Sequence, residues 1–193
     1  MNISSELTQQ IADHQQSAGG MHGLLDQIVE IATLICRSFE SGGRLYTFGN
    51  GGSAADAQHL AAELIGRYKR ERRPLPAMAL TTDPSVMTCI ANDYDYDEVF
   101  ARPVEALAQP GDVVIGFTTS GQSASVVAGL AMARRRGATS VLFAAGDGGR
   151  AAGEADFALL VPASQTARIQ EMHLLSLHLV SEWIDQWAVG SEL

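Results

Sequence analysis

The chain of 193 residues has little cysteine, few aromatic side chains and a shortage of positive charge. Its two cysteines, Cys36 and Cys89, both lie in apolar segments. We therefore predict small core residues in a reducing compartment, and neither a disulfide framework nor a metal knuckle. Lys and Arg number 13 against 22 Asp and Glu, a net charge of −9. This balance argues against nucleic acid as the main partner, because phosphate backbones are bound by basic surfaces.

Long apolar runs are also missing. No segment approaches the length of a membrane span, and the N-terminus lacks a basic-then-apolar signal, so we predict no membrane partner and a cytoplasmic location. Positive charge is concentrated in one short stretch that begins at Arg67. We predict that Lys69–Arg73 is a solvated helix end, where cations offset the helix dipole. Arg67 is expected to share a helix face with Glu63.

What the chain does contain is typical of an α/β protein: 46% hydrophobic residues, 19 glycines and a regular alternation of strand and helix patterns. We predict one domain over residues 1–193, with an N-terminal helical segment (1–41) and an α/β core (42–193). The predicted fold is a five-stranded parallel sheet of doubly wound type, flanked by helices on both faces. Its strands are expected at 44–48, 76–80, 113–117, 140–144 and 157–161. Helices are expected at 4–17, 24–39, 54–68, 85–90, 98–107, 124–136 and 167–187.

Two polar loops follow predicted strands. Gly49–Ser53 precedes a helix, and strand, glycine loop and helix together form a layout that binds anions through free N–H groups. Thr118–Ser123 offers hydroxyls at the start of another helix, and it suits either a phosphate or ordinary helix capping. Both loops are expected at the carboxyl ends of strands, where open parallel sheets bind ligands. Neither fits the Walker lysine pattern or the dinucleotide fingerprint.

Two helices carry candidate reactive side chains. His59 and Glu63 are four residues apart, so they are either a surface pair or a site for a metal ion or proton transfer. In the closing helix, Gln170 and His178 lie about 80° apart, whereas His173 lies about 140° from His178. Gln170 and His178 interrupt an apolar pattern and need partners. They are either core residues bonded to carbonyls or members of a site shared with His59 and Glu63.

Several separated motifs resemble the phosphoheptose isomerases, also called sedoheptulose 7-phosphate isomerases, of the sugar isomerase (SIS) fold group. They include Gly-Asn-Gly-Gly-Ser at 49–53, the segment 56–68, Ala-Asn-Asp-Tyr at 91–94, Thr-Ser-Gly-Gln-Ser at 119–123, Asp-Gly-Gly at 147–149 and Arg-Ile-Gln-Glu at 168–171. The resemblance covers about 42–183. It implies a five-stranded parallel sheet between helices and a homotetramer with sites at subunit boundaries. The chain departs from the family at Thr118 and Gln122, where Ser and Asn are commoner, and at Ala167, where some members have Asp.

The resemblance also implies roles for individual residues. A zinc ion would be held by His59, Glu63, Gln170 and His178, and proton transfer would fall to Glu63 and His178. The substrate, a sugar phosphate, would contact Asn50, Gly51, Gly52, Ser53, Glu63, Arg67, Asn92, Asp93, Thr118, Thr119, Ser120, Ser123 and Gln170. From the residues alone, Asn92-Asp93 is either a third loop entering the site or an ordinary turn.

The implied reaction converts sedoheptulose 7-phosphate to D-glycero-D-manno-heptose 7-phosphate through an enediol, a step in lipopolysaccharide heptose biosynthesis. Such an isomerisation needs a base, an acid and stabilisation of an oxyanion. The main alternative is a non-catalytic SIS protein that binds the replication initiator protein; that relative lacks the carboxylate and the final histidine, which this chain has as Glu63 and His178. A sugar-phosphate sensor and a metal-dependent hydrolase are further alternatives.

Overall fold

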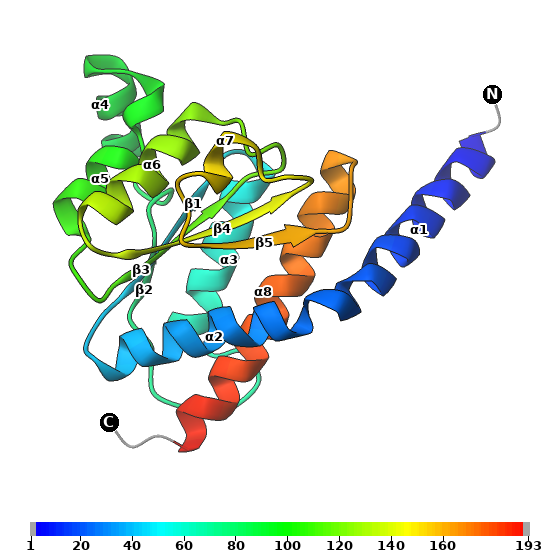
Figure 1. Ribbon diagram of the computed structural model, residues 1–193, viewed down its shortest axis with the longest axis horizontal. Coiled ribbons are helices and arrows are strands. Elements are labelled where there is room, and N and C mark those ends of the chain that lie inside the picture. The colour runs from blue at the N-terminus through cyan, green and yellow to red at the C-terminus, as the bar shows by residue number, and fades with distance from the viewer. Residues whose placement is uncertain (1–2, 191–193) are drawn as a thin grey trace.

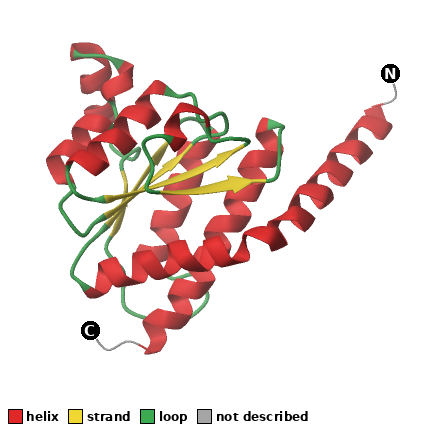
Figure 2. Cartoon of the chain, in the orientation of Figure 1, coloured by secondary structure: helices red, strands yellow, loops and turns green. Residues whose placement is uncertain are grey.

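The computed structural model describes residues 3–190 and contains one five-stranded parallel sheet with strand order β2-β1-β3-β4-β5 (Figures 1 and 2). The register pairs β1 with both β2 and β3, Thr47 lying between Ala79 and Ile115. The strands are β1 (Leu45–Gly49), β2 (Ala77–Ala79), β3 (Val113–Phe117), β4 (Thr139–Ala145) and β5 (Phe157–Val161). All five predicted strands are therefore confirmed, and two of them have the predicted bounds.

Helices cover both faces of this sheet. The α-helices are α1 (Ile3–Gly20), α2 (Leu25–Glu40), α3 (Gly52–Ile65), α4 (Pro84–Asp93), α5 (Ala101–Leu107), α6 (Ala124–Arg135), α7 (Gly149–Ala152) and α8 (Thr166–Gly190). Two short 3-10 helices, η1 (Met21–Leu24) and η2 (Tyr96–Glu98), join some of them. We expected the first helix to end at residue 17, before Gly19 and Gly20, but α1 continues through Gly20 and the chain turns at η1. The short helix α7 was not predicted.

The two faces of the sheet have separate apolar cores, and β3 contributes to both. Val113, Ile115 and Phe117 pack with α2, α3 and α8, whereas Val114 packs with α5 and α6. Successive side chains of a strand point to opposite faces, so a strand covered on both sides is a continuous apolar run. This explains why Val113–Phe117 could be recognised as a strand without any polar alternation.

The strand order reverses direction between β1 and β3. The helix after β1, α3, packs on one face, and the helix after β3, α6, packs on the other. A crevice opens at such a point outside the carboxyl ends of the two strands, where doubly wound sheets bind ligands. The structure thus places the two predicted polar loops side by side.

Helix α1 extends away from the body of the protein (Figure 1). Ile3, Leu7 and Ile11 follow one another at helical spacing, and each is more than half exposed. Contacts of α1 with α8 include the hydrogen bond from Arg168 Nη1 to the Gln10 carbonyl (2.7 Å) and the pair of His14 Nδ1 with Glu171 Oε2 (2.7 Å). An apolar stripe therefore remains uncovered within a single chain.

Two expectations about local environment were wrong. Cys36 is buried, but Cys89 is exposed on α4, where its Sγ donates to Asp93 Oδ2 over 3.4 Å. The basic stretch is no helix end, because α3 stops at Ile65 and the chain continues without regular structure to β2. Within residues 3–190, no helix has the length and apolarity needed to cross a bilayer.

Candidate functional site

A small cavity of about 170 Å³ lies at the carboxyl ends of β1 and β3. It is lined by the β1–α3 loop, the β3–α6 loop and the start of α8. The lining residues are Asn50, Ser53, Phe117, Thr118, Thr119, Ser120, Ser123 and Gln170. Seven of them are polar and uncharged, so any anion in this cavity would be held by neutral donors.

Two glycines shape the first loop. Gly51 has φ +57°, in the region that favours glycine, and it precedes the first residue of α3. Gly52 lies against α8, since a Cβ there would come within 2.3 Å of Gln170 Nε2. The loop therefore needs one glycine for its backbone conformation and the other to leave room for an amide.

The N-termini of α3 and α6 both border the cavity, and neither has a side-chain cap. Ser123 occupies the N-cap position of α6, but its Oγ accepts from Asn50 Nδ2 (2.8 Å) and lies 3.1 Å from Ser125 Oγ. Ordinary capping therefore does not account for Ser123. Uncapped helix starts present free N–H groups and a positive dipole end, which together attract anions.

Capping-type bonds do occur elsewhere in the β3–α6 loop. Thr118 Oγ1 accepts from the Gly121 N–H (3.3 Å), and Ser120 Oγ accepts from the Gln122 N–H (3.2 Å). These bonds hold the loop in shape while the hydroxyl oxygens keep further lone pairs. The structure of Thr118 and Ser120 is therefore compatible with both phosphate binding and ordinary capping.

Two residues that sequence reasoning missed support Asn50. Tyr96 Oη donates to Asn50 Oδ1 (2.8 Å), and Ser125 Oγ accepts from Asn50 Nδ2 (3.0 Å). Together with Ser123 they fix the orientation of the amide at the mouth of the first loop. Ser125 belongs to the polar run that begins at Thr118 and could have been included in it. Nothing in the sequence pointed to Tyr96.

A second cluster of side chains lies between α3 and α8. One ligand atom each from His59, Glu63 and His178 falls within 4.8 Å of the others. His59 Nε2 is 3.0 Å from Glu63 Oε1 and 3.4 Å from His178 Nε2. Tyr68 stacks on the His178 ring, with centroids 5.5 Å apart. The two helices thus bring together the histidines and the carboxylate that the sequence assigned to a shared site.

His178 and His173 have different environments on the same helix. Burial, with the charge of His59 next, lowers the pKa of His178, so its imidazole is neutral at pH 7. His173 is fully buried against Phe117 and Phe143, with Nε2 3.3 Å from the Ala144 carbonyl. Of the two, His173 is the core histidine bonded to a carbonyl, and it points away from the cluster.

The cluster fits a divalent cation. Three potential ligand atoms converge, yet His59 Nε2 cannot both donate its one proton to Glu63 and accept a proton from His178. A cation bonded to all three lone pairs would resolve this conflict. A tetrahedral zinc ion with bonds of about 2.0–2.1 Å separates its ligand atoms by about 3.3 Å. Two of the three separations, 3.0 and 3.4 Å, are close to this spacing, and the third, between Glu63 and His178, is longer but within 4.8 Å.

Other predicted site residues lie apart from this cluster. Gln170 lines the cavity, about 12 Å before His178 along the axis of α8. Arg67 lies beyond the end of α3, so the expectation that it shares a helix face with Glu63 was wrong; its side chain is 59% exposed, with Nε 3.8 Å from Glu71. Asn92 and Asp93 end helix α4, where Asn92 Nδ2 donates to Asp93 Oδ1, and they do not line the cavity.

Comparison with known proteins agrees with this geometry. The SIS domain family matches residues 20–145, which include both loops, His59 and Glu63. A phosphoheptose isomerase from Aquifex aeolicus is 51% identical over 160 residues, 83% of this chain and 84% of the relative. One from Paramagnetospirillum magneticum is 47% identical over 186 residues, 96% of this chain and 97% of the relative. The chain belongs to the phosphoheptose isomerase family.

A solved structure places the fold in the same family. The phosphoheptose isomerase of Neisseria gonorrhoeae superimposes with a TM-score of 0.90 at 38% identity, covering 96% of this chain and all of that one. The resemblance predicted from the sequence motifs is therefore confirmed, and with it the five-stranded fold. As a member of this family, the chain is an isomerase.

Proposed function

We propose that this protein converts sedoheptulose 7-phosphate to D-glycero-D-manno-heptose 7-phosphate through an enediol, with zinc as cofactor. One observation carries the proposal. An anion-type cavity and an acid–base cluster lie along the same two helices, with Ser53 and Glu63 on α3 and Gln170 and His178 on α8. The cavity would hold the phosphate and the cluster would hold the reacting carbons.

The separation of the two parts suits this substrate. Gln170 and His178 are eight positions apart on α8, which is about 12 Å of helix. A seven-carbon chain with bonds of about 1.5 Å spans roughly 8–10 Å from its reacting end to its phosphate. When its phosphate is bound in the cavity, the substrate can therefore place its C1 and C2 near Glu63 and His178. Oriented binding of this kind can supply several kcal/mol of the barrier reduction.

The chain's own side chains divide the proton work. Glu63 takes the proton from C1 of the ketose and returns it to C2. His178, neutral at pH 7, moves the proton between the two oxygens, much as a neutral imidazole does in triosephosphate isomerase. His59, Glu63 and His178 would hold zinc. Gln170 lines the phosphate cavity, about 12 Å before His178 along the axis of α8, and its part as a fourth ligand stays a prediction. When bound, zinc supplies Lewis-acid polarisation of the carbonyl and hydroxyl oxygens.

The decisive experiment measures isomerase activity on sedoheptulose 7-phosphate before and after removal of metal by a chelator. We expect activity to disappear with the metal and to return when zinc is added. Full activity in protein shown to contain no metal would refute a catalytic role for zinc. Absence of turnover in the zinc-loaded protein would refute the substrate assignment, and analysis of the products would separate isomerisation from hydrolysis.

The division of roles has its own test. Glu63→Gln and His178→Gln variants would be incubated with substrate in deuterated water, and exchange at C1 and C2 would be followed by NMR. We expect Glu63→Gln to lose exchange and His178→Gln to slow it. Exchange at the wild-type rate in both variants would contradict the assignment.

We further propose a homotetramer in the cytoplasm. The uncovered stripe of Ile3, Leu7 and Ile11 on α1 supports assembly, because a patch of this kind usually marks an interface. Light scattering of the purified protein would give the subunit number. The presence of both Glu63 and His178 favours the enzyme over a protein that only binds the replication initiator, and a pull-down of that initiator would test the alternative.

A further inference from the structure

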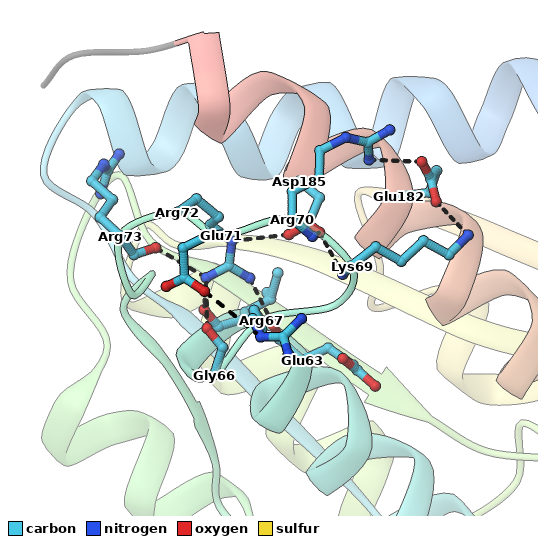
Figure 3. Close-up of polar contacts among 11 residues, drawn as sticks. Glu63, Gly66, Arg67, Lys69, Arg70, Glu71, Arg72, Arg73, Glu182 and Asp185 are labelled. Carbon is cyan, nitrogen blue, oxygen red and sulfur yellow. Dashed lines mark hydrogen bonds and ion pairs between the residues drawn. The ribbon is translucent and has the colours of Figure 1, made fainter.

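Arg72 lies in the irregular connection between α3 and β2, and its side chain is buried. Arg72 Nε donates to Asp185 Oδ1 over 2.9 Å, and each side chain is only 1% exposed (Figure 3). Asp185 Oδ2 accepts from the backbone N–H groups of Lys69 (2.7 Å) and Arg70 (2.8 Å). Asp185 thus fastens the connection to α8 through three hydrogen bonds.

The remaining donors of Arg72 bind the C-terminus of α3. Nη2 donates to the Glu63 carbonyl (2.7 Å), and Nη1 donates to the carbonyls of Leu64 (2.8 Å) and Gly66 (3.0 Å). The last carbonyls of a helix have no partner within the helix, and they form the negative end of its dipole. Arg72 is therefore a cationic C-cap supplied from outside the helix, and it binds the peptide group of Glu63 directly.

The other end of the pair lies on the same face of α8 as His178. Asp185 follows His178 by seven residues, which is two turns and about 20° around the axis. One buried ion pair thus joins the backbone of Glu63 to the face of α8 that carries His178. Because both partners are almost fully buried, their geometry is fixed by packing as well as by charge.

We infer that Arg72 is a positioning residue, which holds the Glu63 carboxylate at its working distance from the His178 imidazole. The inference rests on the proposed function, because it assigns Arg72 a part in that site. It goes beyond stability, since the five contacts of the guanidinium include the peptide of the residue that we propose as the base.

Neighbouring cations in the same connection provide a contrast. Lys69 Nζ and Arg70 Nη1 each lie 2.7 Å from Glu182, with side chains 60% and 38% exposed. Exposed pairs of this kind contribute little to stability because water screens them. Arg70 therefore serves as a matched control, because the same substitution two residues away removes a cation and leaves the α3 carbonyls bound.

The test compares Arg72→Met with Arg70→Met. We expect Arg72→Met to lower kcat about 10- to 100-fold, as loss of an outer-shell partner commonly does, with little change in KM because the phosphate cavity is untouched. Arg70→Met should keep both constants. Wild-type kcat in Arg72→Met, or a change confined to KM, would overturn the inference.

A second variant separates positioning from folding, because Arg72→Met leaves the Asp185 charge buried without its partner. In Arg72→Met/Asp185→Asn the charge is gone, and the amide oxygen still accepts from the backbone of Lys69 and Arg70. We expect the melting temperature to recover while kcat stays low. Recovery of kcat together with the melting temperature would mean that the pair is structural only.

If the proposed function is wrong, the wild-type protein itself will not turn over sedoheptulose 7-phosphate, a result distinct from those above. The inference would then be decided by zinc titration of Arg72→Met and Arg70→Met. Weaker zinc binding in Arg72→Met alone supports positioning of Glu63, and equal binding in the two variants refutes it.

Discussion

Replacing Gly52 by alanine should separate activity from stability. The new Cβ would lie 2.3 Å from Gln170 Nε2 and 2.6 Å from its Cδ, so the amide must move by at least about 1 Å to reach ordinary contact. A displacement of about 1 Å at a substrate- or metal-binding group can cost about 100-fold in rate. We therefore expect kcat/KM to fall by roughly two orders of magnitude.

Stability should hardly change. Gly→Ala at a compatible backbone position stabilises by about 0.4–1 kcal/mol, and Gly52 is helical without a positive φ. Against this, forcing a flexible side chain off its rotamer costs about 0.5–1.5 kcal/mol. The two effects nearly cancel, so the melting temperature should stay within about 4 °C of wild type.

The assay pairs steady-state kinetics with thermal unfolding. Gly19→Ala is the control, because Gly19 is helical and exposed, and a Cβ there meets nothing within 4 Å. It should gain about 0.4–1 kcal/mol with unchanged kinetics. Wild-type kcat/KM in Gly52→Ala would show that Gln170 needs no fixed position, and the reasoning would fail. A large loss of stability would equally contradict it.

Two further predictions concern the cavity and the core. Ser123→Ala removes a hydroxyl that borders the cavity and binds Asn50, so we expect KM to rise about tenfold with a smaller change in kcat, measured by steady-state kinetics. Burial lowers the pKa of His173 from 6.5 to about 4, so the unfolded state takes up the proton first and stability falls as the pH drops from about 6.5 to 4. The loss should be on the order of 3 kcal/mol, and urea unfolding should show a smaller loss in His173→Gln; equal losses would contradict the shift.

The sheet and both loops followed from local patterns. Val113–Phe117 is an unbroken apolar run bounded by Pro110-Gly111-Asp112 and a polar loop, so its bounds were readable without knowledge of its partners. The spacing of His59 and Glu63 placed both on one face of α3, and α8 supplied His178 opposite them. These features depend on period and turn chemistry, which a single sequence carries.

The structure of the connection between α3 and β2 (residues 66–76) could not be predicted from the sequence, because it is set by contacts with distant residues. Five cations in seven positions gave no sign that Arg72 forms a buried ion pair, since its partner Asp185 lies 113 residues away. Asp185 could have indicated a buried ion pair, because it is an acidic residue among the apolar residues of α8. The early end of α3 has the same cause: Gly66 and the Arg72 cap stop the helix, whereas propensity alone favoured continuing it to Tyr68.

Among residues 3–190, none that lines the cavity is ionisable, and this affects how binding responds to pH and salt. Asn, Ser, Thr and Gln side chains keep one protonation state between pH 5 and 9, so the anchor itself does not titrate. The pH dependence of substrate affinity should then follow the ligand, whose phosphate gains its second negative charge near pH 6. Because no lysine or arginine of the described part of the chain lines the cavity, added salt should weaken binding less than it would at a basic pocket.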